Sequence, residues 1–179
     1  IPLPDRLESY NFLHRTPSPD IFQGSFLEMI DLEEPLDNMR EVYHRARADT
    51  ALHRMLHLDL KNTLADNDLR KVNRMCETAG TAVGYPLLDD AMVEFSGRVP
   101  ADLKIKGATL RYFFKDSLKD FLPPEIIKKP KHGFGLPFGL WLKQHAPLRE
   151  LAGDSLQSLR RRQYLNPHYI DTLLNEHHN

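Results

Sequence analysis

The sequence predicts a mainly α-helical structure with eight or so helices and little or no sheet. Apolar residues recur at spacings of three and four from residue 50 to residue 122, which is the period of amphipathic helices. Alternation with period two, the mark of a half-buried strand, is limited to one short candidate at residues 81–85. Thirteen prolines and several capping residues divide the helical pattern into separate segments.

The chain is expected to begin irregularly, because its first 20 residues hold four prolines. Helices are then predicted at 50–65 and 68–79. Their apolar stripes are Leu52, Met55, Leu56, Leu60 and Leu64 in the first and Leu69, Val72, Met75, Cys76 and Ala79 in the second. Asp66, Asn67 and Asp68 can cap the second helix, so a helix boundary is predicted there.

Later boundaries have similar signals. Asp89 and Asp90 can cap a helix after Pro86, and a wide apolar stripe predicts a helix at 107–122. Pro123 and Pro124 end that helix and can open the next at its first turn. A helix is predicted to restart near Pro137. Asn166 followed by Pro167 pairs a capping residue with proline at the first helical position.

Composition excludes several classes. The net charge of −1 gives no global field that would attract nucleic acid or an anionic membrane, and no run of 18 apolar residues predicts a membrane span. The single cysteine, Cys76, excludes a disulfide within the chain and is compatible with a reducing, cytoplasmic location. The length fits one domain or a little more, and because no long linker divides the sequence we predict one helical domain over 1–179. Because it starts at Ile1 rather than Met, we interpret it as a piece of a longer chain.

The most informative segment is the basic loop at 128–139. Residues 126–149 contain no acid, while five lysine and arginine residues and two histidines lie there: Lys128, Lys129, Lys131, Lys143, Arg149, His132 and His145. Glycines and prolines break the helix in this loop and allow close approach of the backbone to a ligand. Lysines on such a loop can contact phosphate or carboxylate oxygens. A small anionic ligand is therefore favoured over a nucleic-acid duplex, and the alternative is a solvated basic face.

Other chemical constellations are weak. His53 and His57 have the i, i+4 spacing of metal ligands, but no glutamate follows the first histidine, so we interpret both as surface residues and expect no metal site. Cys76 lies on an apolar stripe and is predicted to be core. The chain has no G-x-S-x-G elbow, P-loop or G-x-G-x-x-G fingerprint, and so no nucleotide-binding loop of these types.

Several blocks, in order, resemble the C-terminal part of the synthetase domain of asparagine synthetase-like enzymes, and the resemblance implies a family-like helical core at 50–142 that includes the basic loop. Residues 59–75 resemble the family's D…L-x-x-D-x-L-x-K-x-D-R-x-S-M helix, and 85–89 resemble its V-P-F-L-D turn. The loop at 129–134 resembles R-P-K-x-G-F. Further likeness is found in Leu103-Lys104-Ile105, Leu122-Pro123-Pro124-Glu125-Ile126-Ile127, Tyr164-Leu165-Asn166-Pro167 and Leu173-Leu174-Asn175-Glu176-His177.

The resemblance implies an ATP-dependent ligase that adenylates a carboxylate, releases pyrophosphate and forms an amide with ammonia from glutamine. It implies that Lys131 stabilises phosphate charge, with His132 and Gly133 beside it, and that Asp89 lies near the same cleft. The residues alone give Asp89 another role, as the N-cap of a helix. ATP and Mg²⁺ are implied for the full-length enzyme, and none is expected on this piece.

The chain departs from the family in several places. The S-G-G-x-D-S loop, the G-E-G-S-D-E segment and the glutaminase domain are absent, so we expect the helical portion of an adenine-nucleotide-hydrolase-like (PP-loop ATP pyrophosphatase) synthetase domain without its α/β nucleotide-binding part. Ala82, Val83 and Gly84 replace the family's E-x-R, and Asn73 replaces an aspartate. The carboxylate that is amidated is therefore open. The expected partners are the missing glutaminase domain, the missing α/β region and a small carboxylate; a homodimer is open.

The alternative is a non-catalytic helical interaction module derived from the same scaffold. A loop-based nucleic-acid binder is disfavoured by the near-neutral charge.

Overall fold

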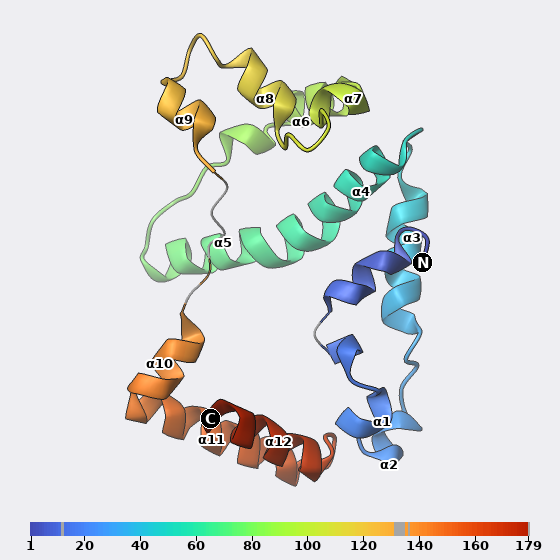
Figure 1. The fold of residues 1–179 in the computed structure, drawn as a ribbon, viewed down its shortest axis with the longest axis vertical. Helices are drawn as coiled ribbons and strands as arrows, with labels where there is room; N and C mark the ends of the chain where they lie inside the picture. Colours follow the sequence, from blue (N-terminus) through green and yellow to red (C-terminus); the bar gives the residue numbers. More distant parts are fainter. Residues whose placement is uncertain (12, 131–134, 136, 179) are drawn as a thin grey trace. The chain divides into compact units, whose positions relative to one another are not determined.

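A computed structural model describes residues 1–11, 13–130, 135 and 137–178, and Figure 1 shows its helices. Within these ranges the regular elements are helical, and pairing of extended backbone is limited to two isolated bridges, Phe22 with Leu165 and Lys106 with Thr109. The short strand candidate at 81–85 has no regular structure. The prediction of a mainly α structure is confirmed.

The described ranges contain twelve α-helices, more than the eight or so expected, because prolines and glycines open several helices of only four or five residues. The helices are α1 (Ser18–Ile21), α2 (Gly24–Leu27), α3 (Glu34–Arg45), α4 (Ala51–Asp59), α5 (Leu69–Thr78), α6 (Asp90–Arg98), α7 (Ala101–Lys104), α8 (Tyr112–Ser117), α9 (Pro124–Lys128), α10 (Phe138–Gln144), α11 (Ala146–Arg161) and α12 (Pro167–His178). Short 3₁₀ turns occur at Asp5–Tyr10, Leu13–Arg15 and Pro86–Leu88. No helix in these ranges combines the length and apolar character that a bilayer crossing requires.

The predicted helix boundary at Asp66, Asn67 and Asp68 is wrong. Helix α4 continues through a π-helical segment, η3 (Leu60–Asp68), directly into α5, and the three form one rod in Figure 1. Asp68 has helical backbone angles, φ −72° and ψ −45°, and its side chain makes no capping bond. The continuous ladder of helical hydrogen bonds satisfies the amides that a cap would have served, so Asp68 is left to accept from Lys71 Nζ at 3.2 Å.

The predicted helix at 107–122 is too long: α8 spans only Tyr112–Ser117, because Gly107 and Arg111 adopt left-handed backbone in the turn before it, and residues 118–122 are not helical.

Three other predicted boundaries are confirmed. Pro124 lies in the first turn of α9, and α10 begins at Phe138, directly after Pro137. Asn166 precedes α12, and its Oδ1 accepts from the amide of His168 at 3.0 Å. Local sequence signals therefore decide where α9, α10 and α12 begin.

The chain divides into two compact units, Ile1–Asp37 with His132–Asn179 and Asn38–Lys131. We call them the terminal unit and the central unit. The single domain over 1–179 remains a prediction.

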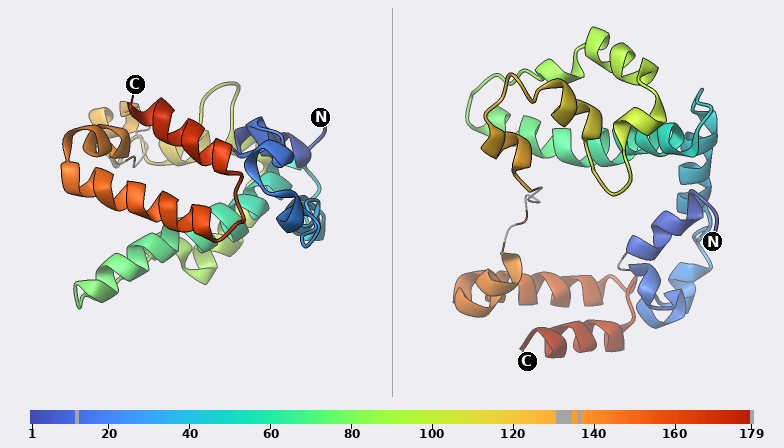
Figure 2. Two further views of the ribbon diagram at one scale, coloured as in Figure 1. Left: turned by 90° about the horizontal axis from the view of Figure 1, so that it is seen from below. Right: turned by 45° about the horizontal axis from the view of Figure 1, so that its top comes forward.

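The terminal unit joins the two ends of the chain. Phe22 forms the isolated bridge with Leu165, and the amide of Asn166 donates to the carbonyl of Ile21 at 2.8 Å. Ile21 and Ile170 are buried, at 2% and 0% exposure, and so form the small core of this unit. Helices α11 and α12 lie side by side (Figure 2), and the Arg160 guanidinium donates to Asp171 at 2.9 Å.

The central unit is organised around the rod formed by α4, η3 and α5. Its buried side chains are Tyr43, Ala46, Leu58 and Val99. The His53 ring nitrogen Nε2 lies 3.1 Å from the carbonyl oxygen of Val99, which ties α4 to the end of α6. Arg54 Nε donates to the carbonyl of Ala48 at 3.0 Å, at the turn where α4 begins.

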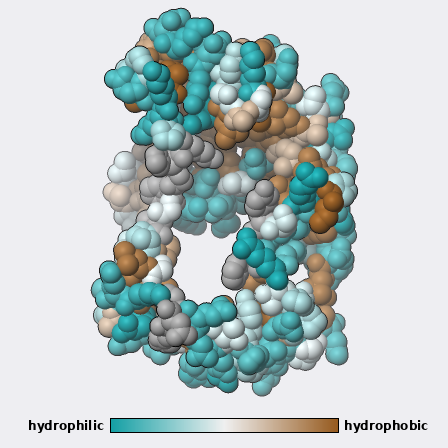
Figure 3. Space-filling model, in the orientation of Figure 1, coloured by the Kyte–Doolittle hydropathy of each residue, from teal (hydrophilic) through white to brown (hydrophobic). Residues whose placement is uncertain are grey.

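Little of the chain is buried. Its accessible surface is 14057 Å². A compact protein of this mass would expose about 8,900 Å², and two separate compact domains of half the mass about 10,700 Å². Figure 3 shows brown apolar surface open to solvent, and the exposed residues include Met75, Leu87, Phe121 and Leu151. The accessible surface of 14057 Å² is larger even than the value for two separate domains, so the excess does not depend on how the two units are arranged.

Candidate functional site

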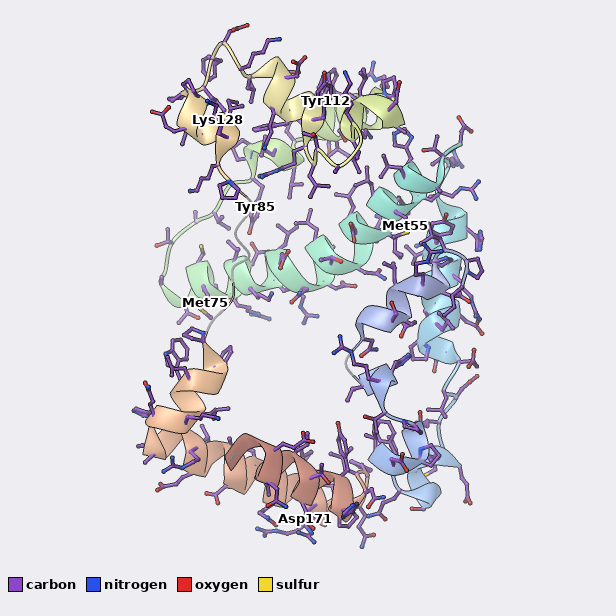
Figure 4. The ribbon with its side chains drawn as sticks, in the orientation of Figure 1. Met55, Met75, Tyr85, Tyr112, Lys128 and Asp171 are labelled. Carbon is purple, nitrogen blue, oxygen red and sulfur yellow. The ribbon has the colours of Figure 1, made fainter. Side chains whose placement is uncertain are left out.

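The basic loop is the first predicted site, and its central residues lie outside the described ranges. These are Lys131, His132 and Gly133, so their predicted contact with phosphate remains a prediction. The flanking residues are described: α9 ends at Lys128 and α10 begins at Phe138, with Lys129, Pro130, Gly135 and Pro137 in non-helical backbone. The predicted break between two helices is thus confirmed. Lys128 (Figure 4) and Lys129 are both exposed, so their charges face solvent.

Two basic residues downstream of the loop have local structural roles. His145 Nδ1 accepts from the amide of Leu148 at 3.3 Å and so caps α11. Arg149 Nη1 donates to the carbonyl of Lys143 at 3.2 Å, which ties α11 to the end of α10. The sequence analysis grouped His145 and Arg149 with the lysines of the basic segment, because charge alone does not distinguish a capping side chain from a ligand-binding one.

Asp89 lies at the junction between the 3₁₀ turn at Pro86–Leu88 and α6. Its Oδ1 accepts from the amide of Ala91 at 3.0 Å, and its carbonyl accepts from the amide of Val93 at 2.9 Å. The predicted capping role is confirmed. The side chain is also exposed, which leaves its second carboxylate oxygen accessible, and the substrate-contacting role implied by the family resemblance remains a prediction.

Replacing Asp89 separates these two roles. Asp89→Ala is expected to lower the free energy of unfolding by about 1 kcal/mol, because an amide of α6 loses its acceptor. Asp89→Asn is expected to retain stability, since asparagine caps as well as aspartate does. Urea unfolding of both variants checks this. Equal stability of Asp89→Ala and the unsubstituted protein would contradict the capping geometry.

The segment before Asp89 is held against α5. Tyr85 lies beside that helix (Figure 4), and its hydroxyl donates to Asn73 Oδ1 at 2.8 Å. Sequence reasoning recognised Asn73 and Tyr85 as parts of two family blocks, but it did not predict their contact because twelve residues and a turn separate them. On the same rod, Lys71 Nζ and Asp68 Oδ1 form an exposed ion pair at 3.2 Å.

The two histidines on α4 differ in their environments. His53 contacts the Val99 carbonyl, whereas Nε2 of His57 is buried without a hydrogen-bond partner. Both side chains are partly buried, so they are not the freely exposed surface residues that the sequence predicted. Cys76 is likewise half-buried rather than core. No group of three or more His, Cys, Asp or Glu residues suited to a metal ion occurs in the described ranges.

Two lysines have shifted pKa values. Burial lowers the pKa of Lys104, because desolvation disfavours the charged ammonium. The hydrogen bond from Lys119 to the Asp116 carboxylate raises the pKa of Lys119. Lys104 lies in the last turn of α7, and Lys119 lies beyond α8. Neither lysine belongs to the predicted site, so these shifts do not mark a reactive group there.

Comparison with known proteins extends the likeness along the chain. The family model for asparagine synthase matches residues 5–179. "Asparagine synthetase (glutamine-hydrolysing) 1" of Bacillus subtilis is 23% identical over 126 residues, which are 70% of this chain and 20% of that protein. A putative asparagine synthetase (glutamine-hydrolysing) of Mycobacterium bovis is 28% identical over 102 residues, which are 57% of this chain and 16% of that protein.

The chain thus spans about a fifth of the length of the curated relatives it matches. No solved structure matches it. The family model, by contrast, covers nearly every residue, including the π-helical rod, the turn before Asp89 and the basic loop. This helical chain therefore belongs to the asparagine synthase family.

Proposed function

We propose that this chain is the C-terminal part of the synthetase region of an ATP-dependent, glutamine-using amidotransferase. The observation that carries the proposal is the family match over residues 5–179. The proposed reaction adenylates a carboxylate, releases pyrophosphate, and transfers ammonia derived from glutamine to the activated acyl group. The relatives' names support amide formation with glutamine as nitrogen donor. The carboxylate is aspartate or another small acid.

Lys131, with His132 and Gly133, is the proposed phosphate-contacting group. A cation on a loop without neighbouring acids can stabilise the charge that develops on phosphate oxygens as pyrophosphate leaves. The absence of acids over residues 126–149 supports this, because no carboxylate within the loop would neutralise the lysine.

The described residues do not by themselves fit Mg²⁺. They contain no group of three or more His, Cys, Asp or Glu residues suited to a metal ion. We therefore propose that ATP and Mg²⁺ bind in the longer protein, through an α/β region and beside a glutaminase domain that lie outside this chain. We also propose that the longer protein is cytoplasmic and does not bind nucleic acid. Whether it forms a homodimer is open.

The isolated chain is expected to bind ATP weakly at best and to have no ligase activity. A lysine loop alone cannot orient a triphosphate and a carboxylate together. The S-G-G-x-D-S loop, whose backbone amides would bind pyrophosphate, is absent from this sequence. Calorimetry with ATP tests this, with inorganic pyrophosphate as a second ligand. Micromolar ATP affinity of the 179-residue chain would contradict the proposal.

A second candidate is a non-catalytic helical interaction module. The large accessible surface and the exposed apolar side chains favour it, because such a surface is suited to covering by another polypeptide. The same surface would also suit contact with the rest of a synthetase domain. Pyrophosphate release by the longer protein, dependent on both ATP and a carboxylate, decides between the two, since the interaction module releases none.

A further inference from the structure

The segment between α5 and α6 carries the further inference. Helix α5 ends where Gly80 adopts a left-handed backbone, φ +63°, and the amide of Thr81 donates to the carbonyl of Cys76 at 2.8 Å. This arrangement fixes the direction in which the chain leaves the helix. Any other residue at position 80 would be strained there, because a side chain disfavours positive φ.

Beyond Thr81 the segment has few attachments of its own. Residues 81–84 are exposed, and in the described chain the backbone groups of Ala82, Val83 and Gly84 form no hydrogen bonds with other backbone groups. No ladder or helix therefore determines the position of the chain as it approaches Asp89.

The Asn73–Tyr85 hydrogen bond supplies that attachment. It joins residues twelve apart and has a donor–acceptor distance of 2.8 Å, the best value for a hydroxyl donor. Tyr85 is partly buried, and its hydroxyl reaches α5.

Tyr85 also begins the turn that positions Asp89. The carbonyl of Tyr85 accepts from the amide of Leu88 at 2.9 Å, which closes the 3₁₀ turn at Pro86–Leu88. Asp89 follows at once and caps α6 through the amide of Ala91. A shift of Tyr85 is therefore transmitted through one closed turn to the Asp89 carboxylate.

We propose that Asn73 and Tyr85 are positioning residues that hold the Asp89 carboxylate at a set place relative to α5 in the synthetase site. The inference deepens the proposed function and rests on it only where Asp89 lies in the synthetase site. The positioning itself is a property of this chain and can be measured without activity.

Amide hydrogen exchange in the longer protein tests the positioning. Tyr85→Phe removes the hydroxyl and keeps the ring, and Asn73→Ala removes the acceptor while favouring the helix. In each, exchange at Leu88 and Ala91 is expected to accelerate roughly two- to tenfold, the effect of losing one ordinary hydrogen bond. The double variant is expected to match the single ones, because both remove the same bond. Asn73→Asp retains an acceptor oxygen and is expected to preserve protection.

Tyr112→Phe is the matched control. Its hydroxyl accepts from Lys106 Nζ at 3.3 Å, so it also forms an exposed hydrogen bond in the central unit. This bond is far in sequence from the turn at Pro86–Leu88. It is expected to leave exchange at Leu88 and Ala91 unchanged. Unchanged exchange in Tyr85→Phe and Asn73→Ala, or equal acceleration in Tyr112→Phe, would overturn the proposal.

Kinetics of the same variants test the link to function. With Asp89 displaced, Tyr85→Phe and Asn73→Ala are expected to change the KM for the carboxylate several-fold, with little change in the KM for ATP. Asn73→Asp is expected to keep both KM values at those of the unsubstituted protein. Accelerated exchange with unaltered kinetics would overturn the link to the carboxylate. If the unsubstituted protein releases no pyrophosphate while the exchange pattern holds, the proposed function fails and the positioning role stands.

Discussion

Replacing Lys131 with alanine in the longer protein is expected to lower kcat about a hundredfold with little change in stability. If the lysine meets phosphate charge mainly in the transition state, its removal costs roughly 3 kcal/mol of transition-state stabilisation. The loss would appear in kcat and kcat/KM together, which is the signature of an interaction made only in the transition state. Pyrophosphate release measures the rate, and thermal unfolding checks that the fold is unchanged.

Lys128→Ala is the matched control for Lys131→Ala. Lys128 has the same side chain and lies three residues earlier, exposed in the last turn of α9. There its charge interacts mainly with the carboxyl end of a short helix, an effect of a few tenths of a kcal/mol at most. We expect activity close to that of the unsubstituted protein. Equal rates for Lys131→Ala and the unsubstituted protein, or equal small losses at both lysines, would remove the proposed role of Lys131.

The second large effect is expected at Ile170. Its side chain is fully buried in the terminal unit, in a helix that the Phe22–Leu165 bridge and the Asn166–Ile21 hydrogen bond attach to the N-terminal segment. Ile170→Ala removes buried methyl groups from a core with few other members, so the unit is expected to lose about 2–5 kcal/mol. Because domains of this size have only about 5–15 kcal/mol of stability, the terminal unit would be largely destabilised.

Fluorescence offers a direct measurement for Ile170→Ala. The single tryptophan, Trp141, lies on α10 in the terminal unit, with its ring against Phe138 at 5.5 Å between centroids, so its emission reports this unit alone. Leu151→Ala on α11 is the control, since Leu151 is 63% exposed and its loss should cost within about 0.5 kcal/mol. If both variants unfold at the same urea concentration, Ile170 is not the core residue that the structure indicates.

Local signals in the sequence predict where several of the helices begin. Proline at the first turn of α9, asparagine before α12 and Asp89 before α6 act through backbone amides two or three residues away. Such signals need no tertiary partner, so they can be recognised in the chain alone. The ordered series of motifs determined the family for the same reason, since it is a pattern in the sequence and requires no coordinates.

Tertiary structure decided what local signals could not. Asp68 is of a residue type that often caps helices, but the π-helical segment continues the helical hydrogen bonds past it. The capping residues in the sequence do not show that the helix continues. The pairing of Tyr85 with Asn73 and of the chain's N-terminal segment with α12 joins residues that no periodicity relates. These contacts are determined only in the folded chain. They depend on the direction of each helix, and that direction is the summed effect of the backbone angles of many residues.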